Sequence, residues 1–306
     1  MLLDKNNTSF GRHESFALRY GWITKGYIAY INDSEIFKKD EATVELGVGR
    51  NMVHAIRYWL NACQIIDEES GNPTEIGEML FDQKNGLDPY LEDEATIWLL
   101  HWLLASNPTK ATAIFWFFNK FHKAEFSSQE VQTALSDFVK DQIETKTSAS
   151  TVKGDAQLVL RMYSPSRAVG KIPVEEALDS PLSLLRLVVH GSSKKNHVSK
   201  PEERKQLPLG VLGYSVLELL KIKRMTSLPI EDLMYAKDHY AAPGAIFRMT
   251  ENDLITRLEQ LVNYIPNKLA IRETAGIHQL YLLDENVDSL SYLQKHYEDS
   301  IKGIAA

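Results

Sequence analysis

The sequence lacks several features that would assign it to a broad class of protein. Its 306 residues include a single cysteine, which excludes an internal disulfide framework and favours a reducing cytoplasm. Two apolar segments, Ala95–Leu104 and Ala111–Phe118, are too short to cross a bilayer. The first residues show no signal-peptide pattern. We therefore expect a cytoplasmic protein that makes no membrane contact.

Motifs for metals, nucleotides and nucleophilic catalysis are also missing. The nine histidines are scattered without an i, i+4 pair, and no Cys/His cluster exists. Gly47-Val-Gly49 lacks the preceding parallel strand and the third glycine of a dinucleotide fingerprint. The chain has neither a Walker sequence nor a nucleophile elbow. The sequence therefore predicts no metal site and no cofactor.

Signals for a nuclease are thin. Asp137, Glu144 and Lys146 loosely resemble the acidic–acidic–lysine set that binds Mg²⁺ or Mn²⁺ and activates water. The set does not lie in a convincing strand, and such triplets often arise by chance. These three residues are the catalytic candidates, with Mg²⁺ or Mn²⁺ as the cofactor if the protein cleaves DNA.

The net charge of −7 is unevenly distributed. Residues 1–60 carry +1 and residues 101–306 carry +1, whereas residues 64–100 carry −9. Binding dominated by non-specific phosphate attraction favours a strongly basic domain, so it is disfavoured here. A selective contact, or help from a partner protein, fits this charge pattern better.

Residues 40–63 have the pattern of a helix-turn-helix. A short helix containing Ala42 and the turn Leu46–Gly49 lead into a longer helix with one apolar stripe. The stripe comprises Met52, Val53, Ile56, Trp59, Leu60 and Cys63. At 100° per residue the opposite side holds Arg50, His54, Arg57 and Asn61, flanked by Asn51 and Tyr58. This face suits a helix in the DNA major groove. The alternative is a helical hairpin with a solvated polar face.

The segments on either side extend this interpretation. Residues 64–81 read as a wing, with a strand at 64–67 and a turn at 71–73, although its acidic tip would repel phosphate. Upstream, a helix opening at His13 or Glu14 would leave basic side chains for DNA, unless the Arg12–Glu14 stretch only caps that helix. The predicted DNA-binding residues are Arg12, His13, Arg19, Lys25, Arg50, Asn51, His54, Arg57 and Tyr58.

The whole chain reads as mainly α with small β wings: winged helix-turn-helix domains joined to a helical middle. Aromatic residues are dense in residues 92–122, where a helical core is favoured over a base-stacking row. A helix from residue 250 followed by strands at 268–272 and 277–282 outlines a second winged helix. The expected domains are a winged helix at 1–90, the helical middle at 91–165, a linker region at 166–210 and a winged-helix-like domain at 211–306.

Four stretches resemble an uncharacterised bacterial family found in DNA phosphorothioation and phage-defence gene clusters. They are Phe10–Trp22, Leu46–Trp59, Arg161–Tyr163 and Thr274–Gly276. The family includes the SspB-like component of Ssp phosphorothioation systems, in which a sulfur replaces a non-bridging phosphate oxygen. The SspB-like protein of those systems is implicated in nicking DNA. The resemblance supplies no catalytic residues.

The resemblance implies that this protein nicks double-stranded DNA, or selects one strand for sulfur modification. Its implied partners are a cysteine desulfurase, an ATPase and a sulfur-transferring enzyme. Two alternatives remain: a non-catalytic reader that brings partner enzymes to a sequence, and a transcriptional regulator of a defence operon. The latter would normally need a dimer and a palindromic site.

Overall fold

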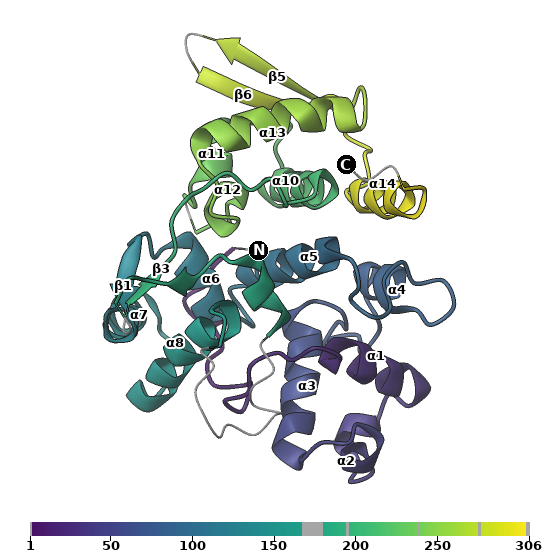
Figure 1. Cartoon of the computed structure of the whole chain (residues 1–306), viewed down its shortest axis with the longest axis vertical. Helices are drawn as coiled ribbons and strands as arrows, with labels where there is room; N and C mark the ends of the chain where they lie inside the picture. Colours follow the sequence, from purple (N-terminus) through teal and green to yellow (C-terminus); the bar gives the residue numbers. More distant parts are fainter. Residues whose placement is uncertain (1, 167–179, 194–195, 238, 275–276, 304–306) are drawn as a thin grey trace. The chain divides into compact units, whose positions relative to one another are not determined.

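The structure is a computed structural model that describes residues 2–166, 180–193, 196–237, 239–274 and 277–303. About half of the chain is helical, with two small three-stranded antiparallel sheets (Figure 1). Its contacts divide it into two compact units. The N-terminal unit holds Leu3–Phe117 and Phe121–Ser199, and the C-terminal unit holds Lys200–Ala306 with Met1–Leu2 and Phe118–Lys120. The four domains expected from the sequence stay a prediction.

The N-terminal unit contains most of the helices and one sheet. Its helices are α1 (Trp22–Asn32), η1 (Ile36–Lys38), α2 (Ala42–Glu45), α3 (Arg50–Ala62), α4 (Glu75–Phe81), α5 (Glu94–Ala105), α6 (Thr112–Asn119), α7 (Ser128–Gln142), α8 (Ala149–Tyr163) and η2 (Pro181–Leu185). The strands β1 (Glu125–Ser127), β2 (Val189–His190) and β3 (Asn196–Val198) form a sheet in the order β1-β3-β2. The last residues of α6 group with the C-terminal unit.

Helix α5 forms the centre of the N-terminal core. All residues from Ala95 to Ala105 are buried, which is expected of a helix that is hydrophobic all round. Trp98 and Phe115 are at most 1% exposed, so the aromatic side chains of this region are confirmed as core. Among the described residues, no helix is long and apolar enough to span a membrane.

The segment predicted to be a helix-turn-helix contains the short helix α2 and the longer helix α3. Gly47, with φ of 63°, permits the left-handed turn between them. On α3, Val53, Ile56, Trp59 and Leu60 are buried, which confirms the predicted apolar stripe. The winged arrangement stays a prediction, because Ile66 and Pro73 form one isolated antiparallel bridge in place of the expected strand.

The prediction of a helix that opens at His13 or Glu14 is wrong. Glu14 and Ser15 have φ values of 49° and 65°, and α1 begins only at Trp22, after the left-handed Gly21. The predicted linker at 166–210 falls partly on residues 167–179 and 194–195, which lie outside the described residues. Its described part includes strand β3, paired with both β1 and β2.

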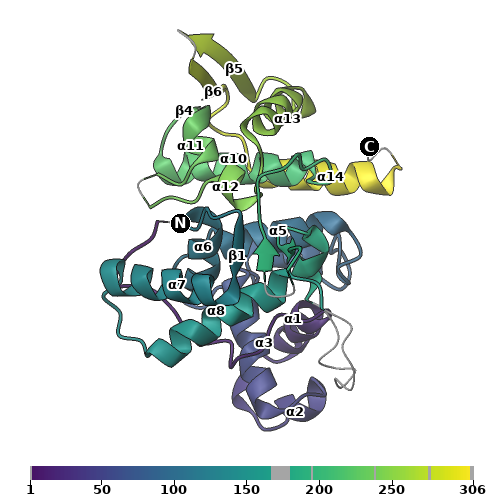
Figure 2. The same ribbon diagram turned by 60° about the vertical axis from the view of Figure 1, so that its left-hand side comes forward.

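The C-terminal unit combines five helices in its described residues with the second sheet. The helices are α10 (Leu209–Lys223), α11 (Ile230–Met234), α12 (Pro243–Ile246), α13 (Glu251–Tyr264) and α14 (Leu290–Ile301); the strands are β4 (Ser227–Pro229), β5 (Leu269–Thr274) and β6 (Ile277–Leu282). The predicted helix and two strands are confirmed as α13, β5 and β6, and β4 adds to β6 in the order β4-β6-β5. Figures 1 and 2 both show α14 beside α10.

Candidate nucleic-acid interface

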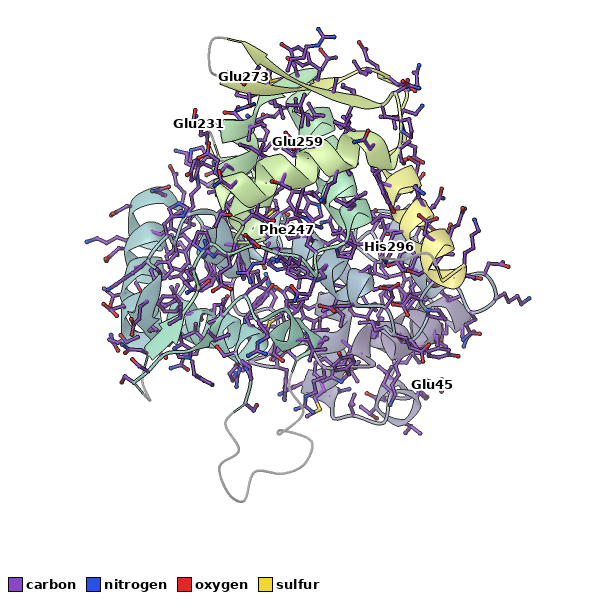
Figure 3. All side chains as sticks on the ribbon, turned by 45° about the horizontal axis from the view of Figure 1, so that its top comes forward. Glu45, Glu231, Phe247, Glu259, Glu273 and His296 are labelled. Atoms are coloured by element: carbon purple, nitrogen blue, oxygen red, sulfur yellow. The ribbon has the colours of Figure 1, made fainter. Side chains whose placement is uncertain are left out.

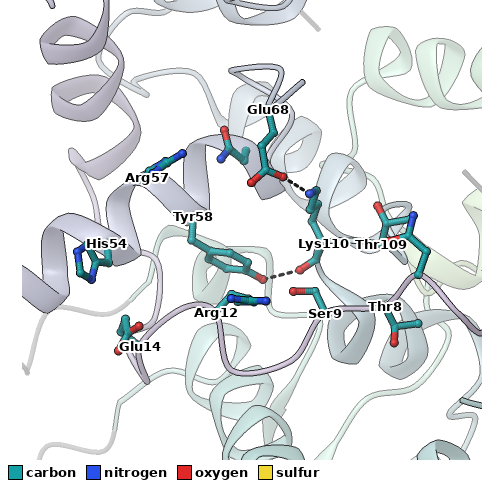
Figure 4. Close-up of a pocket in the computed structure, with 12 residues that line it drawn as sticks. Thr8, Ser9, Arg12, Glu14, His54, Arg57, Tyr58, Glu68, Thr109 and Lys110 are labelled. Carbon is teal, nitrogen blue, oxygen red and sulfur yellow. Dashed lines mark hydrogen bonds and ion pairs between the residues drawn. The ribbon is translucent and has the colours of Figure 1, made fainter. Parts of the chain in front are cut away.

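A polar pocket of about 470 Å³ opens on the N-terminal unit. Figure 4 shows that it lies between α3, the loop at residues 7–14 and the residues just before α6. Its lining comprises Asn7, Thr8, Ser9, Arg12, Glu14, His54, Arg57, Tyr58, Asn61, Glu68, Thr109 and Lys110. We call this the basic pocket, because Arg12, Arg57 and Lys110 outnumber its two carboxylates.

Helix α3 supplies one wall of the basic pocket. His54, Arg57, Tyr58 and Asn61 follow one another at helical spacings of three and four, so they share the face opposite the buried stripe. The helix is held by Trp59, which is fully buried and donates from Nε1 to the carbonyl of Phe16 at 3.2 Å. Packing of the apolar stripe thus turns the polar face of α3 toward the pocket.

Asp155 of α8 anchors the loop that carries Arg12. Both carboxylate oxygens of Asp155 accept from the backbone N–H of Gly11 at 3.1 Å, and Oδ1 lies 3.0 Å from Nε2 of His13. The N–H of Ser15 donates to Nδ1 of His13 at 3.1 Å, so Nε2 carries the proton and donates to Asp155. Arg12 is therefore held between two fixed neighbours.

Two arginines give the basic pocket its charge. The ammonium group of Lys110 is paired with Glu68. Within the described part of the chain, neither the Arg12 nor the Arg57 side chain has a hydrogen-bond or ion-pair partner, and both are exposed. Two guanidinium groups without an ion-pair partner among the described residues line one concave surface, and together with Lys110 they outnumber Glu14 and Glu68. This arrangement favours an anion with several oxygens.

The half-buried Tyr58 lines the basic pocket and links two of its elements. Its hydroxyl donates to the carbonyl of Lys110 at 2.8 Å, a contact drawn in Figure 4. Burial, helped by the nearby Asp155 carboxylate, raises the pKa of Tyr58 above its usual range. The hydroxyl therefore stays protonated and joins α3 to the residues before α6.

The structure brings four of the nine predicted DNA-binding residues together, namely Arg12, His54, Arg57 and Tyr58. The other five lie outside the pocket lining. His13 is buried, so it supports the pocket from beneath and its side chain does not reach the surface. Arg50 pairs with Asp40, and the Arg19 guanidinium lies 5.3 Å from the centre of the Trp22 ring. Asn51 and Lys25 are exposed on α3 and α1. DNA contact by any of the nine stays a prediction.

Sequence reasoning missed two parts of the basic pocket. Lys110 and Asp155 lie far along the chain from α3, and neither belongs to a motif. Asp155 sits within the helical pattern of α8, where nothing in its spacing distinguishes a buried anchor from a solvated carboxylate. The folded chain is needed to place them beside Arg12.

The catalytic candidates lie away from the basic pocket. Asp137 is exposed on α7, and Lys146 is exposed in the segment that follows it. Glu144 pairs with Lys5, whose Nζ lies 2.5 Å from its Oε1. Over the described residues, no group of three or more His, Cys, Asp or Glu side chains could hold a metal ion. Cleavage by these residues stays a prediction.

Comparisons with known proteins relate the chain to SspB. A structure described as magnesium-ion-bound SspB is 28% identical, with a TM-score of 0.84, and the match covers 96% of this chain and 89% of that one. A second SspB crystal structure is 27% identical with a TM-score of 0.81 and the same coverage. No curated protein matches. The model of a family described as a protein of unknown function, DUF4007, matches residues 10–297, and this chain belongs to that SspB-like family.

Proposed function

We propose that this protein binds double-stranded DNA through the basic pocket and acts in a DNA phosphorothioate modification and defence system. Within that system it nicks DNA or selects the strand that receives sulfur. The similarity to SspB over nearly the whole chain supports the system. The observation that carries DNA binding is the convergence of Arg12 and Arg57, both without partners among the described residues, on one pocket.

The geometry of α3 suits this proposal. A planar guanidinium can donate two parallel hydrogen bonds to a phosphate, so Arg12 and Arg57 together can grip the DNA backbone. The polar face of α3 then continues through His54 toward its N-terminal end, where Arg50 and Asn51 are exposed. Phosphate contacts would fix the helix in register, and the exposed face would meet base edges in the major groove.

Magnesium is named in the description of one similar SspB structure. Among the described residues of this chain, no group of three or more His, Cys, Asp or Glu side chains gathers to hold such an ion. We therefore derive no catalytic step through a metal ion. The nicking activity is proposed from the family likeness and must be tested directly.

A non-catalytic reader is the second candidate function. It fits the two unpartnered guanidinium groups of the basic pocket, because a guanidinium can hold a phosphodiester but cannot attack it. In this case partner enzymes of the modification system, such as the cysteine desulfurase, the ATPase and the sulfur-transferring enzyme, would act on the DNA that this protein has selected.

DNA binding is tested by fluorescence anisotropy with a labelled duplex. Arg12→Gln and Arg57→Gln should each weaken the affinity about tenfold, because each removes charged hydrogen bonds to phosphate. Lys140→Gln is the matched control, since Lys140 is exposed on α7 outside the pocket lining. An equal loss of DNA affinity in all three variants would mean that only net charge matters. Unchanged affinity in both arginine variants would show that the basic pocket does not bind DNA.

Nicking is tested by incubating supercoiled plasmid with the protein and Mg²⁺, Mn²⁺ or EDTA. Metal-dependent open circles that disappear with Arg57→Gln would support a nickase that is positioned by α3. Glu144→Ala and Asp137→Ala test the catalytic candidates in the same gel. Intact plasmid with a retarded complex would identify the protein as a reader.

A further inference from the structure

A second pocket, of about 750 Å³, lies entirely within the C-terminal unit. It is formed by the segment 205–209 at the start of α10, by α13 and by α14. Figure 3 labels His296 on α14, the yellow helix, and this residue belongs to the pocket lining. The volume falls within the range of ordinary small-molecule sites, roughly 300–1,000 Å³. We call it the C-terminal pocket.

Arg257 of α13 is a buried cation in the wall of this pocket. Its side chain is only 8% exposed. One of its terminal nitrogens donates to the carbonyl of Leu207, but its Nε is buried without a hydrogen-bond partner. No carboxylate within the described residues forms an ion pair with it. A buried charge in this state is costly unless a further group completes it.

The N-terminus of α10 opens onto the same pocket. Leu207, Pro208 and Leu209 line the pocket, and Pro208 is the N-cap residue of this 15-residue helix. Proline offers no capping side chain, and the first turn contains no acidic residue. The backbone N–H groups there thus concentrate the positive end of the helix dipole without a counter-charge from the helix itself.

The turn at Gly210 is packed too tightly to admit a side chain. A Cβ at Gly210 would lie 2.5 Å from the carbonyl oxygen of Tyr292 and 2.8 Å from the Cβ of His296. The first turn of α10 is therefore fixed directly against α14, and its N–H groups have a constant direction relative to the pocket. A fixed array of donors is what an anion site requires.

The remaining charges at the pocket are already engaged. Lys205, at the pocket edge, lies 3.3 Å from a carboxylate oxygen of Glu203. Asp299 is the carboxylate of the lining, and it accepts from Lys295 at 2.8 Å. Asp299 is thereby offset by Lys295. Burial lowers the pKa of Arg257, and the charge of the nearby Asp253 opposes this only in part. Arg257 and the start of α10 are therefore the positive groups of the lining that have no ion-pair partner among the described residues.

We propose that the C-terminal pocket binds the phosphate of a nucleotide. Arg257 and the first turn of α10 hold the phosphate oxygens. Tyr264 of α13 and Leu209 of α10, both half-buried, provide surface for the sugar and base. The same phosphate chemistry occurs in a free nucleotide and in a DNA strand. The proposal does not rest on DNA binding by the basic pocket.

Isothermal titration calorimetry on the full chain tests this. Deoxyadenosine monophosphate should bind, inorganic phosphate should bind more weakly, and deoxyadenosine without phosphate should not bind. A short single-stranded oligonucleotide is titrated into the Arg12→Gln/Arg57→Gln protein, in which the basic pocket is disabled. Binding of the mononucleotide identifies a free nucleotide as the source, and binding of the oligonucleotide alone identifies a DNA strand.

Variants locate the binding. Gln260→Glu adds a carboxylate at an exposed position of the lining and should weaken binding about tenfold. Gln294→Glu makes the same charge change at an exposed position of α14 outside the lining and should leave binding unchanged. Arg257→Gln should abolish binding, and circular dichroism checks that this variant folds. If Arg257→Gln does not fold, the comparison of Gln260→Glu with Gln294→Glu alone locates the binding site.

The proposal is overturned by either of two results. One is that neither mononucleotide, phosphate nor oligonucleotide binds at millimolar concentration. The other is that Gln260→Glu and Gln294→Glu bind these ligands equally. The proposal that the basic pocket binds DNA would fail separately, if duplex affinity were unaffected by Arg12→Gln and Arg57→Gln.

Discussion

Removing the carboxylate of Asp155 should both destabilise the N-terminal unit and disturb the basic pocket. Asp155 is 4% exposed and accepts from Gly11 and His13, and His13 in turn accepts from Ser15. Asp155→Ala leaves two donors buried without an acceptor, at about 1–3 kcal/mol each. We therefore expect a loss of about 3–5 kcal/mol of unfolding free energy, the usual effect of removing one partner of a buried polar pair.

Thermal unfolding followed by circular dichroism measures this loss. For a unit of this size, 1 kcal/mol corresponds to about 2–4 °C, so the Tm of the transition that includes the N-terminal unit should fall by roughly 6–12 °C or more. Asp141→Ala is the control, because Asp141 is exposed on α7. A Tm of Asp155→Ala equal to that of the control would refute the view that Asp155 anchors this loop.

A double-mutant cycle extends the test to DNA affinity. Asp155→Asn keeps one acceptor oxygen, so the protein should fold while the loop at residues 11–15 is held less firmly. If Asp155 acts on DNA only by positioning Arg12, then Asp155→Asn should weaken binding in the wild-type protein and have little further effect in Arg12→Gln. Additive losses would instead assign Asp155 an effect on DNA that does not pass through Arg12.

Three further predictions concern α3, α7 and the salt dependence of binding. Ile56→Ala should cost about 2–5 kcal/mol in urea unfolding, because Ile56 is 1% exposed in the stripe of α3. Ser127→Ala should cost about 1 kcal/mol, because it removes the capping box of α7. Bonds from Lys123 and Ser127 lower the pKa of Glu130 from 4.5 to about 2, so its contribution is complete above about pH 4.5 and is lost as the pH falls toward 2; the variant should show a smaller loss over that window. The logarithm of DNA affinity should fall with the logarithm of salt concentration with a slope of about −2, as expected if Arg12 and Arg57 neutralise two phosphates.

Much of the helical framework could be predicted from the sequence. The stripe on α3 is strictly periodic, and the apolar density of α5 and α6 leaves burial as the stable outcome. The start of α13 is also set locally, because the Thr250 hydroxyl accepts from the N–H of Asp253. In these cases residues within one or two helical turns determine the structure.

The residues around His13 show why local patterns fail at the candidate site. Phe16, Tyr20 and Ile23 have helical spacing. The polar bonds of His13 to Asp155 and Ser15 instead favour left-handed turns at Glu14 and Ser15. The partner that decides this lies 142 positions away. Because the pocket depends on such distant contacts, no local pattern points to Lys110 or Asp155.

The acidic segment that follows α3 helps explain how a protein of net charge −7 could select a DNA orientation. Beside the basic pocket lies a smaller pocket of about 210 Å³ that shares Arg57, Asn61 and Glu68 with it but also contains Asp67 and Glu69. Arg57 thus stands at the boundary between a surface that attracts phosphate and one that repels it. In the proposed complex, a DNA backbone would bind on the Arg12 side and be repelled from the other side, and this repulsion would fix its direction in a way that additional positive charge could not.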